Sequence, residues 1–408
     1  MSITDFNAWK SYENYASGQM TDGNNGIVYS CTGGNTLYIG HRNGKIVSVN
    51  KSDTRSLIYN MASLYGGSYH HICGMIYAYD LLFAMHTQDS ATAKLRAFDI
   101  SLPNTVAVAS DDLGTQDPYS IATDWDQTSN TFDIFVARQN STALLKRTVT
   151  VNTETKVPAF SNILGCRVGV LTNGITYRKY GNDKYIYVTT GGSTVYQVVN
   201  FAAIADSSNN SLGIQYSNLS VGHNAWGIVW CENLSRFFIS EQNGKVYEYS
   251  VTIDSGSGKI SALTYVGIAL GGNSTGSSSG VTNGNAATST NFNKSASLST
   301  NYINGRTNVY VATTDAYVIK LYPSGGTGIG GDPHIMPLIG NLYTLDNNVK
   351  YVKMFENHNG LDKVIVVCET WFLPNEELLK FYEIRGRKFK SLEDENLNQW
   401  KNLHILKL

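Results

Sequence analysis

Residues 226–249 read WGIVWCENLSRFFISEQNGKVYEY, and this stretch predicts the fold of most of the chain. A glycine and an apolar run come first, then a polar turn, a second β-rich run at 235–240 and an alternating run at 246–249. Asn243-Gly244 before the last run is a strong hairpin signal, because both central residues of the favoured tight turn need a positive φ. The alternation fits a strand with one face in a core. The segment therefore predicts three consecutive antiparallel strands.

The same three-strand unit recurs along the chain. Residues 25–49 and 173–198 align with it, and weaker copies run over 71–98, 119–136 and 307–321. The middle of the second strand of each copy is marked by Ile39, Phe83, Phe135, Tyr187, Ile239 and Val311. The successive spacings of these markers are 44, 52, 52, 52 and 72 residues. A four-stranded blade of a β-propeller occupies about 40–50 residues, so the repeat predicts an all-β protein with a propeller.

We place this six-bladed β-propeller at residues 1–322, with seven blades as the alternative. The first residues are candidates for the strand that closes the ring. The long last spacing contains a run rich in Gly, Ser, Asn and Thr from Gly271 to Asn291, which we interpret as a surface insertion. The repeats resemble those of NHL-like and quinoprotein-like propellers, and this resemblance implies no particular activity.

Composition excludes several classes of protein. The 408 residues include 26 Tyr and 38 Gly but only 7 Pro, which favours half-buried strands and tight turns. A net charge of −1 gives no reason to expect a nucleic-acid partner. The N-terminus lacks the pattern of a signal peptide, and no apolar run approaches the ~18 residues of a membrane span. We expect the five separated cysteines to be buried free thiols rather than a disulfide framework or a zinc site: Cys31, Cys73, Cys166, Cys231 and Cys368.

Polar residues near the predicted entry strands are candidates for a binding site at the mouth of the propeller channel. They are His70, His71, Asp124, Asp126, Arg178, His223 and Glu232. A Ca²⁺ site, as in a lactonase-like propeller, would need several side-chain oxygens to converge, here those of Asp124, Asp126 and Glu232. The sequence contains no nucleophile elbow, phosphate loop or His-x-x-x-His pair. We therefore expect no cofactor and no metal, with Ca²⁺ as the alternative, and a Tyr- and Asn-rich surface suited to protein docking.

A second, more highly charged region follows a Gly-rich linker at residues 323–331. Residues 331–408 contain 10 Lys or Arg and 11 Asp or Glu, roughly twice the charge density of the preceding chain. We predict a small β-rich domain over 332–408. Its expected strands are 350–355, 363–372, 379–384 and 403–408, with a turn or short helix start at 391–396.

This domain opens with Gly331-Asp332-Pro333-His334 and continues through Pro337 to Leu345. The opening resembles that of von Willebrand factor type D domains, and the continuation is similar to domains on structural proteins of large DNA viruses. Leu338-Ile339-Gly340 stands where the family usually has Phe-Asp-Gly, and Cys368 is the segment's only cysteine. We interpret the segment as a divergent or truncated relative that folds without disulfides.

The Asp332-Pro333 bond carries chemistry of its own. The resemblance implies self-cleavage, which several members of the family perform. The Asp332 carboxyl can attack its own carbonyl carbon to form a cyclic anhydride, while His334 supplies a proton to the departing proline nitrogen. The structural alternative is that Pro333 stiffens the first strand and Asp332 caps neighbouring N–H groups.

We expect a non-enzymatic structural or adhesion protein, with the virion as its setting and other proteins or a host surface as its partners. A virion explains an extracellular type of module without a signal peptide or a cysteine framework. One alternative is a secreted or surface adhesin, and another is a lactonase- or hydrolase-like propeller enzyme. Three or more carboxylates converging at one channel mouth favour the enzyme, whereas a mouth lined with Tyr, Ser and Asn favours docking.

Overall fold

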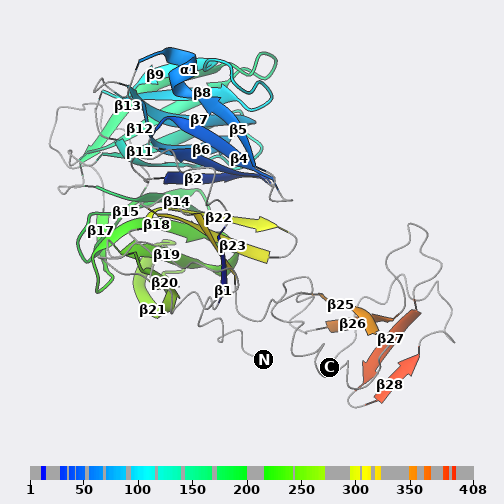
Figure 1. The fold of residues 1–408 in the computed structure, drawn as a ribbon. Helices are drawn as coiled ribbons and strands as arrows, with labels where there is room; N and C mark the ends of the chain where they lie inside the picture. Colours follow the sequence, from blue (N-terminus) through cyan, green and yellow to red (C-terminus); the bar gives the residue numbers. More distant parts are fainter. Residues whose placement is uncertain are drawn as a thin grey trace. The chain divides into compact units, whose positions relative to one another are not determined.

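The structure, a computed structural model, describes two parts of the chain (Figure 1). In the first part it describes residues 11–14, 28–34, 36–41, 43–50, 55–67, 70–88, 93–114, 118–138, 143–167, 172–199, 216–241, 244–271, 295–303, 306–313 and 318–322. In the second part it describes residues 349–355, 363–368, 380–385 and 388–391. The two parts belong to separate compact units, Met1–Pro323 and Ser324–Leu408.

The first unit contains six four-stranded antiparallel sheets, each of which is one blade. The innermost strands are β2 (Val28–Gly33), β6 (His70–Ala78), β10 (Pro118–Thr123), β14 (Ile175–Tyr180), β18 (Ala225–Cys231) and β22 (Ser295–Ile303). The second strands are β3 (Thr36–His41), β7 (Leu81–Gln88), β11 (Thr131–Arg138), β15 (Asp183–Thr189), β19 (Arg236–Glu241) and β23 (Arg306–Thr313). The third strands are β4 (Lys45–Val49), β8 (Lys94–Asp99), β12 (Ala143–Val151), β16 (Thr194–Val199), β20 (Val246–Ile253) and β24 (Val318–Tyr322). The outermost strands are β5 (Arg55–Asn60), β9 (Ala109–Asp112), β13 (Pro158–Arg167), β17 (Tyr216–Ser220), β21 (Ile260–Leu270) and β1 (Ser11–Asn14).

These sheets form a closed ring. Each innermost strand contacts the innermost strands of the two neighbouring blades, in the order β2, β6, β10, β14, β18, β22 and back to β2. The last blade takes its outermost strand from the beginning of the chain, because β1 pairs with β24 from Ser11 opposite Tyr322 to Asn14 opposite Ile319. The structure confirms the six-bladed β-propeller and the closing strand, and the seven-bladed alternative is wrong.

The core lies between the blades. All six marker residues of the repeat are completely buried on second strands: Ile39, Phe83, Phe135, Tyr187, Ile239 and Val311. A second strand is covered on both faces by adjacent blades, so its residues are apolar in continuous runs rather than in alternation. Phe83 of β7, for example, packs edge-on against Phe132 of β11 in the next blade, with ring centroids 5.8 Å apart. Adjacent blades therefore bury one another.

The second unit contains an antiparallel meander of four strands, β25 (Val349–Phe355), β26 (Lys363–Cys368), β27 (Lys380–Arg385) and β28 (Lys388–Ser391). The first three agree with predicted strands. The fourth lies where the sequence predicted no strand, and it ends at Ser391, the first residue of the predicted turn or short helix start. It pairs with β27 from Arg385 opposite Lys388 to Tyr382 opposite Ser391. The strand predicted at 403–408 lies outside the described residues, as does the insertion predicted at 271–291 except for Gly271. Within the described residues, no helix has the length and apolar character needed to cross a membrane.

Candidate functional site

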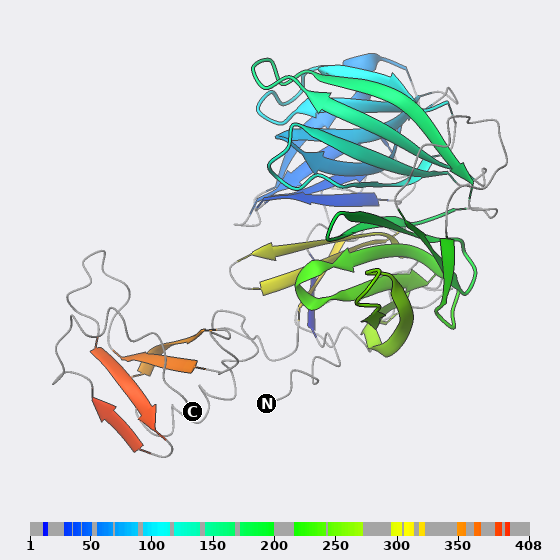
Figure 2. The same ribbon diagram turned by 180° about the vertical axis from the view of Figure 1, so that it is seen from behind.

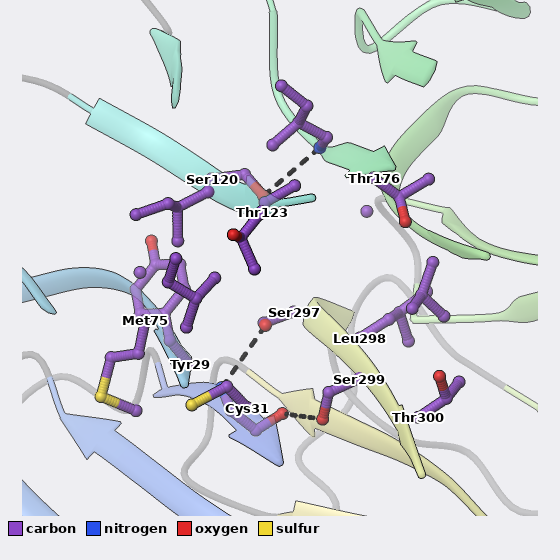
Figure 3. Close-up of a pocket in the computed structure, with 18 of the residues that line it drawn as sticks. Tyr29, Cys31, Met75, Ser120, Thr123, Thr176, Ser297, Leu298, Ser299 and Thr300 are labelled. Atoms are coloured by element: carbon purple, nitrogen blue, oxygen red, sulfur yellow. Dashed lines mark hydrogen bonds between the residues drawn. The ribbon is translucent and has the colours of Figure 1, made fainter. Parts of the chain in front are cut away.

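The six innermost strands surround a cavity of about 280 Å³ on the axis of the propeller (Figure 3). Each strand contributes three or four consecutive lining positions. The lining comprises Tyr29–Thr32, Gly74–Tyr77, Ser120–Thr123, Ile175–Tyr177, Gly227–Val229 and Ser297–Thr300. Hydroxyl groups are abundant in this list, and none of these lining residues carries a charged side chain.

The hydroxyls connect neighbouring blades around the cavity. An innermost strand has one edge without a partner strand, so its backbone N–H and C=O groups need other partners. Ser120 Oγ accepts a hydrogen bond from the Ile175 N–H at 3.3 Å, and Thr176 Oγ1 accepts one from the Trp230 N–H at 3.0 Å. Side-chain hydroxyls of one blade thereby satisfy the backbone of the next.

The same arrangement joins the first and last blades. The Ser30 N–H donates to Ser297 Oγ at 3.4 Å, and Thr32 Oγ1 donates to the Thr300 carbonyl at 2.8 Å. The Ser30 and Ser299 hydroxyls lie 2.9 Å apart, and a dashed line marks this hydrogen bond at Ser299 in Figure 3. These contacts follow the same order along β2 and β22, so these two innermost strands run in the same direction. Sequence reasoning missed these hydroxyl residues, because Ser and Thr are common on strands and have no distinctive spacing here.

A glycine allows two blades to approach closely at the end of the cavity where the innermost strands begin. A Cβ at Gly174 would lie 2.7 Å from the Trp226 carbonyl oxygen and 2.9 Å from Gly227 Cα, closer than side chains tolerate. The Tyr119 ring of β10 and the Trp226 ring of β18 meet edge-on with centroids 5.6 Å apart, although β14 lies between these strands in the ring. Each aromatic residue directly precedes a lining residue, so the pair lies next to the cavity.

The predicted candidates divide between the two ends of the innermost strands, and none of them lines the cavity. His70 and His71 begin β6, and His223 precedes β18 by two residues. Asp124 and Asp126 follow the end of β10, Glu232 follows the end of β18, and Arg178 lies in the second half of β14. Because the innermost strands run in parallel, the histidines lie toward one mouth and the other four toward the opposite mouth. The structure therefore does not bring the seven residues together.

Asp124 belongs to an ion-pair network between the third and fourth blades. One carboxylate oxygen accepts the Asp133 N–H at 2.6 Å, and the other pairs with the Lys184 ammonium. Lys184 also lies 3.0 Å from Asp133, which pairs with Lys146 at 2.9 Å. Burial opposes ionisation of Asp133, but hydrogen bonds from Lys146, Thr148 and Lys184 outweigh it and lower the pKa of Asp133. The network holds Asp133 ionised and pairs both carboxylates with Lys184.

The other two predicted carboxylates are also used locally. Asp126 Oδ1 accepts hydrogen bonds from the backbone N–H groups of Thr128 and Ser129, both at 3.0 Å, and from the Thr128 hydroxyl. These bonds lower the pKa of Asp126 to about 2. Glu232 accepts a hydrogen bond from the indole N–H of Trp230. Among the described residues, no group of three or more His, Cys, Asp or Glu is arranged to hold a metal ion.

Arg178 is buried and holds the turn between β20 and β21 against the fourth blade. Its guanidinium donates to the Gly258 carbonyl at 2.9 Å and to the Tyr187 hydroxyl at 3.3 Å. The guanidinium carbon also lies 5.2 to 5.5 Å from the ring centroids of Tyr180, Tyr185 and Trp230. Strand β21 pairs with β20 through three register shifts, and both strands curl strongly (Figure 2). Arg178 thus ties this curled hairpin to its neighbouring blade.

His70 and His86 form a buried pair at the other end of the second blade. Arg96 Nε donates to His86 Nδ1 at 2.9 Å, so the His86 hydrogen lies on Nε2 and is donated to His70 Nδ1 at 3.0 Å. The Arg96 guanidinium also covers the Tyr65 ring at 3.8 Å. Burial, together with the charge of Arg96, lowers the pKa of His86 to about 3. His71 lies next to this pair, opposite Thr87 of β7.

His223 lies in a cluster of aromatic rings. Its ring stacks on Tyr247 with centroids 4.0 Å apart, and Tyr249 lies 5.9 Å away. Burial lowers the pKa of His223, although the charge of Glu241 partly opposes this. The stacking gives His223 a packing role. The predicted self-cleavage residues Asp332, Pro333 and His334 lie outside the described residues.

No protein-family model matches this chain, and no curated protein does. A chain of a mitotic checkpoint complex is 11% identical, with 74% of this chain and 76% of that chain covered and a TM-score of 0.42. A protein of unknown function from Bacteroides thetaiotaomicron is 11% identical, with 76% and 75% covered and a TM-score of 0.45. The Cps50 (Swd1) β-propeller domain of Myceliophteria thermophila is 10% identical, with 76% and 99% covered and a TM-score of 0.44. The fold assignment therefore rests on the strand pairing, and these similarities carry nothing about function.

Proposed function

We propose that the protein is a non-enzymatic structural or adhesion protein whose propeller docks to other proteins. One observation carries the proposal: the carboxylates expected at the channel mouth are engaged by their own chain. Asp124 is paired with Lys184, Asp126 caps a turn, and Glu232 accepts the Trp230 indole N–H. A hydrolase or a Ca²⁺-dependent lactonase would need such groups to face a substrate or a metal.

Exposed apolar side chains at the edge of the first two blades support docking. Leu57 of β5 is 46% exposed, and Leu102 and Val106 of the β8–β9 connection are 49% and 57% exposed. The Asn104 N–H donates to the Ile58 carbonyl at 2.7 Å, which holds this connection against β5. We call Leu57, Leu102 and Val106 the rim patch. Exposed apolar side chains on adjoining segments suit a protein partner with its own apolar surface.

The setting that we propose is the virion, with docking to other virion proteins or to a host surface. This part of the proposal depends on the resemblance of residues 331–345 to domain openings of type D modules and of viral structural proteins. A secreted or surface adhesin would use the same propeller surface and differs only in its location. Association with a capsid is the property that separates the two.

The test is co-migration with capsid proteins in a density gradient, with the full chain and with a double variant, Leu102→Asp/Val106→Asp. We expect the wild-type chain to co-migrate with the capsid and the double variant to shift to the fractions of free protein. Tyr265→Asp is the matched control, because Tyr265 is also exposed but lies on β21, the outermost strand of the fifth blade. Wild-type chain that stays free of every assembly, or turnover of a lactone by the pure chain with Ca²⁺, would contradict the proposal.

A further inference from the structure

The channel cavity presents hydrogen-bond donors that the fold leaves available. A hydroxyl group has one hydrogen and two lone pairs. Ser120, Thr176 and Ser297 each use a lone pair to accept a backbone N–H from a neighbouring blade. Each hydroxyl therefore keeps its own hydrogen for another acceptor. All three line the same cavity, and Figure 3 shows them on three different sides of it.

The same cavity also presents acceptors. Thr32 donates its hydrogen to the Thr300 carbonyl, so the lone pairs of its hydroxyl oxygen remain. One hydroxyl of the Ser30 and Ser299 pair donates to the other, which leaves a donor on one residue and lone pairs on both. A ligand that matches this wall needs donors and acceptors close together. Hydroxyl groups supply both.

The absence of charged side chains from the cavity wall restricts the ligand further. The lining residues include no Asp, Glu, Lys, Arg or His. A charged ligand would lose its hydration without gaining an opposite charge, which is costly, whereas a neutral ligand loses less. Met75, Ile121 and Leu298 add apolar surface between the hydroxyls. The cavity thus combines hydroxyl groups with apolar patches and lacks charge.

We propose that this cavity binds a neutral polyhydroxylated small molecule, a single sugar ring or a polyol of similar size. A sugar ring has hydroxyl groups around its edge and C–H groups on its faces, which is the combination that the wall offers. The volume of about 280 Å³ lies near the lower end of the ligand pockets of proteins, about 300–1,000 Å³, and so suits one ring rather than a chain of rings. This site is independent of docking through the rim patch.

The experiment measures binding to the full chain by titration calorimetry and by ligand-observed saturation-transfer NMR. The neutral probes are D-glucose, D-galactose and myo-inositol, and the charged probes are sulfate and tetramethylammonium. We expect saturable binding of at least one neutral probe and none of the charged probes. Saturable binding of neither class, or binding of a charged probe as tight as that of the neutral ones, would overturn the proposal.

Two variants at one position locate the site. Ser297→Ala removes one hydroxyl and should weaken binding by about three- to tenfold, the usual effect of one lost hydrogen bond. Ser297→Leu fills part of the cavity and should abolish binding. Ser261→Leu is the matched control, because Ser261 lies exposed on the outermost strand β21, away from the cavity. Circular dichroism establishes that each variant is folded, and unchanged binding in folded Ser297→Leu would place the ligand elsewhere.

Discussion

Gly258 shows how one residue can fix the position of a whole hairpin. It lies in the turn between β20 and β21 with a φ of 71°, and its carbonyl accepts the hydrogen bond from Arg178. A Cβ at this position would overlap the Tyr180 ring. The left-handed backbone and the close ring both require glycine here.

We therefore expect Gly258→Ala to lower the free energy of unfolding by about 2 kcal/mol, from backbone strain and the displaced Tyr180 ring. Gly256→Ala is the control two residues earlier. A Cβ there would meet its nearest neighbour at 3.6 Å, an ordinary contact, and the Gly256 φ is not positive. Urea unfolding of both variants compares the two positions. Equal stability of the two would show that the hairpin does not depend on this contact.

The sequence could not predict which polar residues face the channel. Individual residues show why. Asp124 is paired with Lys184, which lies 60 positions further along the chain. Nothing local to Asp124 indicates that partner, so the sequence could not show that the carboxylate is already occupied. Ser120 and Thr176 are equally unremarkable in sequence, because their roles depend on backbone groups of other blades.

At the scale of elements, much more was predictable. The second strands are sandwiched between blades, so their apolar runs and the turns around them mark every blade in the sequence. All six marker residues are buried as a result. Strand β28 was missed because Lys388–Ser391 is short and charged, and only its pairing with β27 makes it a strand.

Two buried histidines, His86 of β7 and His41 of β3, make the stability of the first two blades sensitive to acid. Burial and Arg96 lower the pKa of His86 to about 3, and burial lowers that of His41 to about 4. Unfolded histidine titrates near pH 6.5. Between about pH 6.5 and the lowered folded values, the unfolded chain binds protons that the folded chain does not, so stability falls as pH falls.

We expect the free energy of unfolding to decrease below pH 6.5 by at most about 1.4 kcal/mol per pH unit for each of these histidines. Urea midpoints at pH 7, 6 and 5 measure the slope. His86→Gln removes one titrating group and should make the slope shallower, at the cost of some stability at pH 7. The same slope in wild type and variant would mean that His86 does not contribute.

We expect strand β1 to stabilise the ring more strongly than its short length suggests. It is the outermost strand of the last blade, yet it joins the two ends of the propeller through its pairing with β24. Deletion of residues 1–15 should lower the midpoint of thermal unfolding by several degrees, because the last blade loses a strand and the ring loses its closure. Deletion of residues 1–8 leaves β1 in place and is the control. Equal midpoints for the two deletions would assign closure to the inter-blade contacts alone.

At the scale of the whole molecule, the chain consists of two units, and the first contains everything that a closed propeller requires. All six blades, the closing strand and the buried core residues lie between residues 11 and 322. Residues 1–323 should therefore fold without the second unit and unfold cooperatively within a few degrees of the full chain. The measurement is the near-ultraviolet circular dichroism melt of both proteins, with residues 16–323 as the variant that lacks closure. Aggregation of residues 1–323, or loss of their cooperative transition while the full chain retains it, would show that the second unit contributes to the stability of the ring.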